Sequence, residues 1–296
     1  MRGFLKVILG NRKAVVGLVI VGMIVLGALL APLLSHFEPL KRLGRPHEAP
    51  NLVHLLGTTR MGQDVWSQLL YGSRTSLAVG FATGILITAI GTLVGLVAGY
   101  FGGRIDAVLN TLTNVVLVIP NLPLLLVLSA FIGQAGPVVI TLIIASTSWA
   151  WGARVTRAQT MSLREKDFIR VAEIGAEPTW RILLAEILPN LISIVTINLI
   201  GSITYAVMTE ATLEFLGLGD PQSVSWGMML HNAQNASALT VGAWWEVLAP
   251  CAALGLLGAG LSLINFAVDE VSNPRLRSGA VRRRWLMRLK LAEARP

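Results

Sequence analysis

Polar side chains that could bind a solute are few in the apolar parts of this chain, and most of them carry amides or hydroxyls. They are Asn114, Asn121, Gln134, Asn198, Ser202, Thr204 and Tyr205, followed by Glu210 and Glu214. Amides and hydroxyls act by hydrogen bonding, which suits a neutral or zwitterionic solute. The same groups also join neighbouring helices in a membrane, and that interpretation stays open beside the first. For a solute pathway we nominate five of them: Asn198, Ser202, Tyr205, Glu210 and Glu214.

The residue patterns give no indication that this chain is an enzyme. Neither H-E-x-x-H nor G-x-S-x-G occurs, and the only adjacent acid pair is Asp269 with Glu270. The single cysteine, Cys251, permits no internal disulfide. The histidines all fall outside the apolar runs, at His36, His47, His54 and His231. We therefore expect no catalytic residue, no metal site and no cofactor bound by this chain.

The composition indicates which elements position these side chains. Apolar residues make up 54% of the chain and charged residues 14%, and the mean hydropathy is +0.67. Soluble domains carry about 25% charged residues, so this is an all-α polytopic membrane protein. The net charge of +8 comes without basic patches interleaved with aromatic residues, and it therefore gives no indication of nucleic-acid binding.

Five uncharged stretches predict six transmembrane helices, because the longest of them exceeds one crossing. They are residues 14–35, 75–103, 107–153, 187–209 and 247–268, and the turn-forming IGQAGP at 132–137 divides the third. The first stretch is too long for a signal peptide and lacks a cleavage site. The predicted regions are a tail (1–13), a transmembrane helix (14–35), an exported loop (36–74), a five-helix core (75–272) with a cytoplasmic loop (154–186) and an exported loop (211–246), and a basic tail (273–296).

Basic residues predict the orientation of the helices. Nineteen of the 24 lysines and arginines fall on the side of the two termini, and the second exported loop has none. The positive-inside rule therefore places both termini in the cytoplasm. The cluster RRRW at 282–285 is expected to lie against anionic lipid headgroups.

A charged segment, DFIRVAEIGAEPTWRILLAEILPN at 167–190, interrupts this apolar pattern. Its spacing predicts a short amphipathic helix whose apolar side carries Phe168, Val171, Ala172, Gly175 and Ala176. Gly175 and Pro178 are expected to end it, and Thr179 to cap a second turn. Small residues on one side favour docking in the groove of a partner, while a helix lying on lipid is the alternative.

The segment resembles the cytoplasmic Glu-Ala-Ala…Gly…Ile-Leu-Pro loop of permease subunits in bacterial ABC importers. Counting back from Pro189, the Glu-Ala-Ala positions fall on Arg170, Val171 and Ala172, and the glycine position falls on Ala176. The glycine stands one position early, at Gly175, so we expect the helix break to be displaced. The resemblance assigns ATPase coupling to Asp167, Phe168, Arg170, Val171, Ala172, Gly175, Ala176, Glu177, Trp180, Arg181 and Pro189.

Two further blocks narrow the resemblance to the C-type permease of the dipeptide/oligopeptide/nickel group. LGTTRMGQDVWSQLLYGSRTSL at 56–77 is similar to the segment that leads into the second span, and EATLEFLGLGDPQSVSWGMML at 210–230 to the exported loop; NPRLR at 273–277 is a weaker match. In the exported loop, glycines and a proline predict a sharp turn, and a tryptophan is expected at the bilayer interface. These residues are Gly217, Gly219, Pro221 and Trp226. Asp64 is expected to form an ion-pair cluster with Arg60 and Arg74.

The resemblance implies the type I ABC importer permease fold, in the inner membrane. It implies a paralogous B-type permease, two ATPase subunits and an extracytoplasmic binding protein as partners. The chain lacks a G-x-x-x-x-G-K-[ST] loop, so ATP and Mg²⁺ are expected on the partner subunits. Peptides are the expected cargo, with nickel chelates and oligosaccharides as alternatives. A secondary transporter or channel is the alternative from another class, but it would normally need ionisable residues or matched broken helices within the membrane, and we expect neither here.

Overall fold

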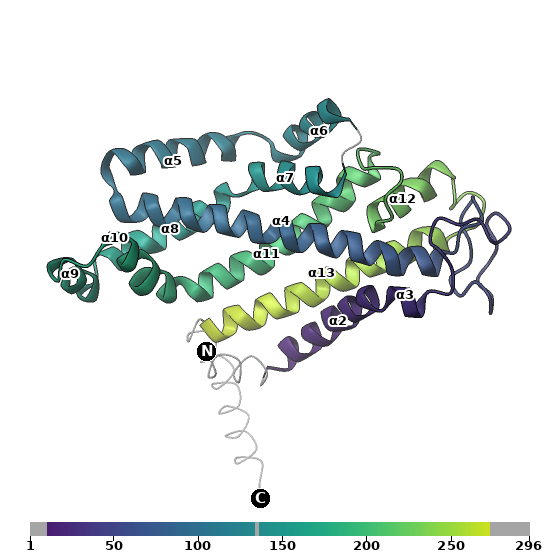
Figure 1. Ribbon diagram of the computed structural model, residues 1–296, viewed down its shortest axis with the longest axis horizontal. Helices are drawn as coiled ribbons and strands as arrows, with labels where there is room; N and C mark the ends of the chain where they lie inside the picture. The colour runs from purple at the N-terminus through teal and green to yellow at the C-terminus, as the bar shows by residue number, and fades with distance from the viewer. Residues whose placement is uncertain (1–10, 134–135, 273–296) are drawn as a thin grey trace, which may run out of the picture.

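The computed structural model describes residues 11–133 and 136–272, and regular structure in those ranges is helical (Figure 1). The helices are α2 (Arg12–Leu29), α3 (Ala31–Leu34), α4 (Val65–Phe101), α5 (Gly103–Val118), α6 (Asn121–Ile132), α7 (Pro137–Ser148), α8 (Ala150–Arg164), α9 (Asp167–Ile174), α10 (Thr179–Arg181), a π-helical turn (Ile182–Ile187), α11 (Leu188–Phe215), α12 (Trp226–Asn235) and α13 (Trp245–Ser272). The predicted basic tail, including RRRW and NPRLR, lies outside the described residues.

Four helical segments are long and apolar enough to cross a membrane. They are α2, α4, the stretch Thr179–Phe215 and the stretch Trp245–Glu270. Two helix pairs pass the same test together but are bent, α5 with α6 by 84° and α7 with α8 by 44°. The protein is therefore a helical multi-pass membrane protein with four spans, or up to six if each bent pair is one span. The count of six stays a prediction.

The bends lie in the long uncharged stretch 107–153, where the sequence predicted one break. That break is present, since α6 ends at Ile132 and α7 begins at Pro137. A second break follows from Pro120, because the residue before a proline is driven into an extended conformation and Ile119 has ψ 126°. In the last turn of α7 the hydroxyl of Thr147 donates to a backbone carbonyl of the same helix, a pattern that bends helices. Broken helices, which the sequence analysis did not expect, are thus present.

Asp64 determines where α4 begins, earlier than the predicted second span. Its carboxylate accepts a hydrogen bond from the backbone N–H of Ser67 at 2.8 Å and so caps the first turn. The other carboxylate oxygen lies 2.9 Å from Nδ1 of His54. The expected ion-pair cluster of Asp64 with Arg60 and Arg74 is therefore wrong, because the carboxylate is already occupied and the guanidinium of Arg74 lies over an aromatic ring instead.

Helix α4 is central and packs closely on both α8 and α11 (Figure 1). Its glycines make this approach possible: Gly80, Gly84, Gly91, Gly95 and Gly99. A Cβ at Gly84 would lie 2.8 Å from the backbone of Ile203 in α11, and one at Gly95 would lie 2.6 Å from the carbonyl oxygen of Ala153 in α8. Close packing along this glycine series was predicted from its spacing, and it is confirmed.

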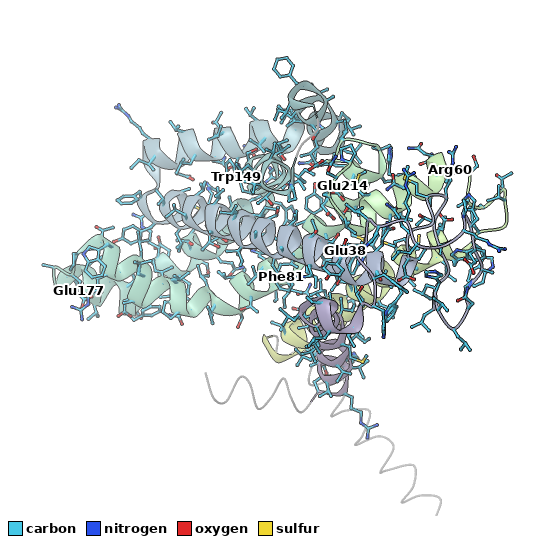
Figure 2. All side chains as sticks on the ribbon, turned by 45° about the vertical axis from the view of Figure 1, so that its right-hand side comes forward. Glu38, Arg60, Phe81, Trp149, Glu177 and Glu214 are labelled. Atoms are coloured by element: carbon cyan, nitrogen blue, oxygen red, sulfur yellow. The ribbon has the colours of Figure 1, made fainter. Side chains whose placement is uncertain are left out.

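The two ends of the helix bundle differ in what they carry. Figure 1 shows α9 and α10 at one end, and α12 with the loop 35–64 at the other. Figure 2 likewise separates Glu177 at one end from Arg60 at the other. The start of α2 is tied to the last turns of α13, since the amide of Asn11 donates to the carboxylate of Glu270 at 3.1 Å. The described ends of the chain therefore lie on the same side of the bundle.

Candidate functional site

Helix α9 is fixed to the bundle along one side. Ile169 is its fully buried residue, with 0% of its surface exposed, and it belongs to an apolar cluster with Leu96, Ile182 and Leu191. The hydroxyl of Tyr100 at the end of α4 lies 3.1 Å from the carboxylate of Glu173. These contacts hold α9 against the ends of α4 and α11.

The opposite side of α9 is apolar and exposed. Phe168 is 41% exposed, Val171 68% and Ile174 86%. The sequence analysis placed the first two on this side but missed Ile174, although its spacing of i+3 from Val171 was a usable signal. Ala172, which was expected on the same side, is partly buried against the apolar cluster around Ile169. We call Phe168, Val171 and Ile174 the outer face of α9.

The end of α9 follows the frame of the resembled loop more closely than the glycine suggested. Gly175 has an ordinary φ of −69°, whereas Ala176 is left-handed with φ 54°. The N–H of Ala176 donates to the carbonyl of Glu173 at 3.0 Å, and that of Glu177 to Ala172 at 3.1 Å. This is the hydrogen-bond pattern of a helix that ends on one left-handed residue. The expected displacement of the break to Gly175 is therefore wrong.

The chain returns to the bundle through α10 and the π-helical turn. Pro178 precedes α10, so Thr179 is its first residue rather than its cap. Trp180 is exposed. The turn widens just before Pro189, which has no N–H to donate and whose ring crowds the preceding turn. The charged residues of the segment lie at the surface: Asp167 in the first turn of α9, Arg170 beside Glu165 at 3.2 Å, and Arg181 beside Glu177 at 3.6 Å.

A cavity of about 570 Å³, lined by amide and hydroxyl groups among a larger number of apolar side chains, lies where α5, α8, α11 and α13 meet. It brings together three of the five nominated pathway residues, Asn198, Ser202 and Tyr205. The hydroxyl of Tyr205 donates to Oδ1 of Asn121 at 2.6 Å. Asn265 also lines the cavity and was missed, although it is a lone amide within a predicted span. We call this the polar cavity.

The other two nominated residues lie elsewhere, at the end that carries α12. Glu210 is 0% exposed and Glu214 1% exposed, and neither lines the polar cavity. The hydroxyl of Ser76 in α4 donates to Glu210 at 3.2 Å, and the hydroxyl of Ser225 donates to Glu214. The carboxylates therefore tie α11 to α4 and to the start of α12. Gln134, named with the polar residues, lies outside the described residues.

The loop between α11 and α12 turns sharply and packs inward. Gly217 has φ 83°, a conformation that favours glycine. Gly219 has no room for a side chain, since a Cβ there would lie 2.8 Å from Cγ of Glu214. Pro221 follows in the turn. Trp226 is only 1% exposed and its indole donates to the carbonyl of Leu69 at 3.1 Å, so its expected position at the bilayer interface is wrong.

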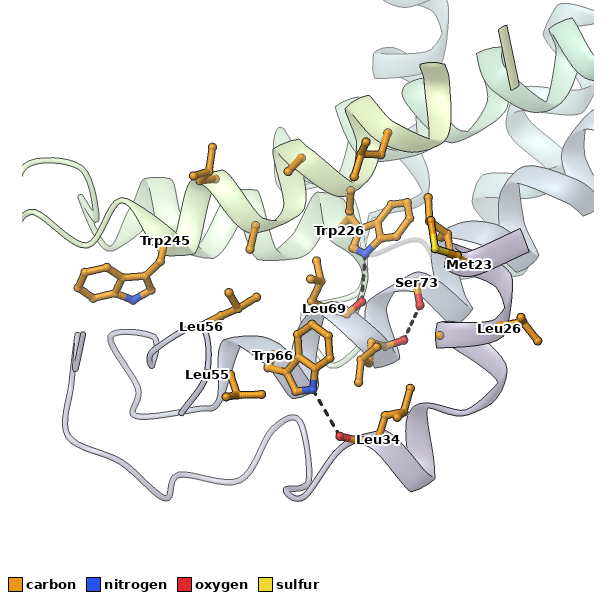
Figure 3. Close-up of a pocket in the computed structure, with 18 of the residues that line it drawn as sticks. Met23, Leu26, Leu34, Leu55, Leu56, Trp66, Leu69, Ser73, Trp226 and Trp245 are labelled. Carbon is orange, nitrogen blue, oxygen red and sulfur yellow. Dashed lines mark hydrogen bonds between the residues drawn. The ribbon is translucent and has the colours of Figure 1, made fainter. Parts of the chain in front are cut away.

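A second hollow, the apolar groove, lies between α2, α4 and α13 (Figure 3). Its volume is about 820 Å³. The indole N–H groups of Trp66 and Trp226 both donate to backbone carbonyls, and the hydroxyl of Ser73 donates to the carbonyl of Leu70 (Figure 3). These three polar groups are thus occupied within the chain, and most of the groove wall is apolar.

Comparison with known proteins places these features in a family. The family described as binding-protein-dependent transport system inner membrane component matches residues 91–278. The N-terminal transmembrane domain of oligopeptide transport permease C matches residues 1–50.

Individual relatives align over nearly the whole chain. A putative peptide transport system permease protein of Brucella abortus is 33% identical over 271 residues, covering 90% of this chain and 89% of its own. The dipeptide transport system permease protein DppC of Haemophilus influenzae is 31% identical, covering 90% of this chain and 92% of its own. The oligopeptide transport system permease protein OppC of Mycobacterium bovis is 31% identical, covering 94% of each. The chain belongs to the family of inner-membrane permease components of binding-protein-dependent transport systems.

Proposed function

We propose that this protein is one permease subunit of an ATP-driven importer that takes up peptides delivered by a binding protein. The observation that carries the proposal is the outer face of α9, an exposed apolar surface at the end of the bundle opposite α12. The polar cavity supplies uncharged hydrogen-bonding groups for a zwitterionic cargo. Peptide cargo is further supported by relatives that are named as peptide, dipeptide and oligopeptide transport permeases.

In this proposal the chain forms half of the translocation pathway. A paralogous B-type permease forms the other half, and two ATPase subunits bind ATP and Mg²⁺. The outer face of α9 enters a cleft of one ATPase subunit. Because Ile169 fixes the inner side of α9 to the start of the long helical stretch Thr179–Phe215, movement of the ATPase is passed to α11. Such coupling requires that docking is stronger in one state of the transporter than in the other.

The same proposal includes the orientation of the chain. The end that carries α9 is cytoplasmic and the end that carries α12 is exported. Arginines such as Arg157 and Arg164 belong to α8, which leads into α9, whereas the loop and helix between α11 and α13 contain neither lysine nor arginine. This distribution follows the positive-inside rule and supports cytoplasmic termini.

Charge substitutions on the outer face of α9 test the docking. The variants are Val171→Glu and Ile174→Glu, and Ser162→Glu, an exposed position in α8 before the loop, is the matched control. Both positions on α9 are exposed in this chain, so a glutamate there disturbs a partner and not the fold. We expect each α9 variant to lose most substrate-stimulated ATP hydrolysis in the reconstituted complex, while the control keeps it.

Assembly is followed by size exclusion of the same preparations. Loss of attached ATPase with the two permeases still paired supports docking at α9. Full stimulated activity in both α9 variants would show that α9 rests on lipid, and the coupling mechanism would be rejected. A second experiment measures uptake of labelled dipeptide in the presence of nickel-chelate or oligosaccharide competitors, each with its own binding protein. It decides among the three classes of cargo.

A further inference from the structure

The polar cavity contains two amide groups that find no partner within the described part of the chain. They are Nδ2 of Asn198 in α11 and Oδ1 of Asn265 in α13, and both atoms are buried. Asn198 is 8% exposed and Asn265 is partly buried. A buried polar group without a partner costs about 1–3 kcal/mol, so two of them in one cavity indicate that something else binds there.

Several other polar groups of the cavity are already occupied within the chain. The hydroxyl of Tyr205 and Oδ1 of Asn121 bind each other, and Nδ2 of Asn121 reaches the carbonyl of Thr147 at 3.3 Å. These contacts join α6, α7 and α11, so Asn121 and Tyr205 have little hydrogen-bonding capacity left for a cargo. The lining therefore contains partnered groups that hold helices together and an unpartnered pair of buried amide atoms.

The unpartnered pair offers one donor and one acceptor. A peptide unit presents the complementary set, a carbonyl oxygen and an N–H. Because each amide side chain carries both a donor and an acceptor, rotating both amides together exchanges their roles and keeps the match. The residues that line the cavity include no charged side chain, so nothing there selects the side-chain charges of a cargo.

We propose that Asn198 and Asn265 hydrogen-bond the main chain of the cargo, with Asn198 donating to a peptide carbonyl and Asn265 accepting from a peptide N–H. The proposal rests on the proposed function as a peptide importer and names the contact that such a cargo makes. A site that binds only the main chain accepts peptides of many sequences, because every peptide has the same backbone N–H and C=O groups. Sequence preference is then left to the binding protein.

Gly152 in α8 lies beside the amide of Asn198. A Cβ at Gly152 in α8 would lie 4.0 Å from Nδ2 of Asn198, which is van der Waals contact without overlap. The glycine therefore leaves room beside the buried donor on the side of α8. Gly152→Ala adds one methyl group beside the donor and leaves the amide itself in place.

The test compares a peptide with its ester analogue in proteoliposomes that contain the complete importer and its binding protein. The ester lacks the N–H but keeps a carbonyl. Initial uptake rates are measured at saturating loaded binding protein for wild type, Asn265→Leu, Asn198→Leu and Gly152→Ala. Thr204→Val is the matched control, because Thr204 lies in α11, donates to its own helix at Ile200 and does not line the cavity. The binding protein is the same throughout, so its own preference cancels from the comparison.

We expect the ratio of amide to ester uptake to fall by roughly 3- to 10-fold in Asn265→Leu, the value of one hydrogen bond. Asn198→Leu and Gly152→Ala are expected to slow both cargoes, since both keep the carbonyl, and Thr204→Val to change neither rate. Asn265→Ala takes the place of Asn265→Leu if the leucine variant fails to assemble. An unchanged ratio at position 265 with full rates at position 198 would show that the amides bind only water, and would refute this inference alone. Absence of peptide uptake by wild type would refute the proposed function and this inference with it.

Discussion

Helices α9 and α12 are both short helices between long ones, at opposite ends of the bundle, and they use apolar residues in opposite ways. In α12, Trp226, Met228 and Met229 are buried against the rest of the chain. In α9, Val171 and Ile174 are exposed. Apolar side chains left outside a folded chain mark a surface that another molecule covers. The comparison indicates that α12 is complete within this protein and that α9 is not.

Polar contacts show the same difference between the two helices. The start of α12 is held through Ser225 to the carboxylate of Glu214, and its first backbone N–H donates to Ser76 at 3.3 Å. At α9, one hydrogen bond from Tyr100 to Glu173 and the burial of Ile169 provide the attachment. A helix held by so few contacts can move with a partner, whereas a helix locked from three sides keeps the far end of the bundle rigid.

The largest expected effect comes from removing the inner anchor of α9. Ile169→Ala deletes a fully buried side chain, which costs about 2–4 kcal/mol of local stability. We expect faster amide hydrogen exchange across residues 167–174 and unchanged exchange in α12. Ile174→Ala, at an exposed position on the same helix, is the control. Equal protection of α9 in wild type and Ile169→Ala would show that other contacts hold the helix.

A somewhat smaller effect is expected from crowding α12. Gly227→Ala places a Cβ 2.8 Å from Cβ of Glu214 and 2.9 Å from Cα of Ala211, so about 1–3 kcal/mol is lost. Gly255→Ala, in open space within α13, is the control and should stabilise its helix by about 0.5–1 kcal/mol. Thermal unfolding of the purified protein reports both. A stable Gly227→Ala protein would mean that α12 is less tightly packed than the contacts indicate.

The smallest expected effect concerns Ala176, the left-handed residue at the end of α9. Ala176→Gly relieves the left-handed conformation of the alanine and stabilises the helix end by about 1 kcal/mol. Hydrogen exchange of residues 167–177 should therefore slow slightly. Ala172→Gly, within the regular part of α9, is the control, because there the same change should lose about 0.5–1 kcal/mol of helix stability. The idea fails if the two substitutions have the same effect.

Much of the fold was predictable because hydropathy and charge act locally along the chain. Uncharged runs indicated the long helices, and the glycine series of α4 indicated close packing that Gly84 and Gly95 show. The bend before Pro120 was also readable from the proline but was overlooked. In the predicted coupling segment the left-handed residue is Ala176, the position that counting back from Pro189 gave for the glycine. The role of that segment in coupling stays a prediction.

Burial and pairing were less predictable, because they depend on residues far apart in sequence. The carboxylate of Asp64 could have bound either of two arginines, and the nearby ring of His54 took that place. Trp226 has the residue type of a bilayer interface, but it fills the space beside α4. Glu210 and Glu214 looked like pathway residues because they are ionisable groups at the outer end of a span, but they accept hydrogen bonds from Ser76 and Ser225 within the chain.

The sequence by itself determined a helical membrane protein, its apolar stretches, a charged interruption of defined frame and a resemblance strong enough to name the family. These properties follow from the order of residues along the chain and do not depend on which residues become neighbours in the folded protein. Only the tertiary structure decided that Asn121 is occupied by Tyr205 while Asn198 and Asn265 keep free amide atoms, and that the outer face of α9 is uncovered. Hydrogen-bond partners and burial arise where helices distant in sequence meet, so no local pattern can assign them.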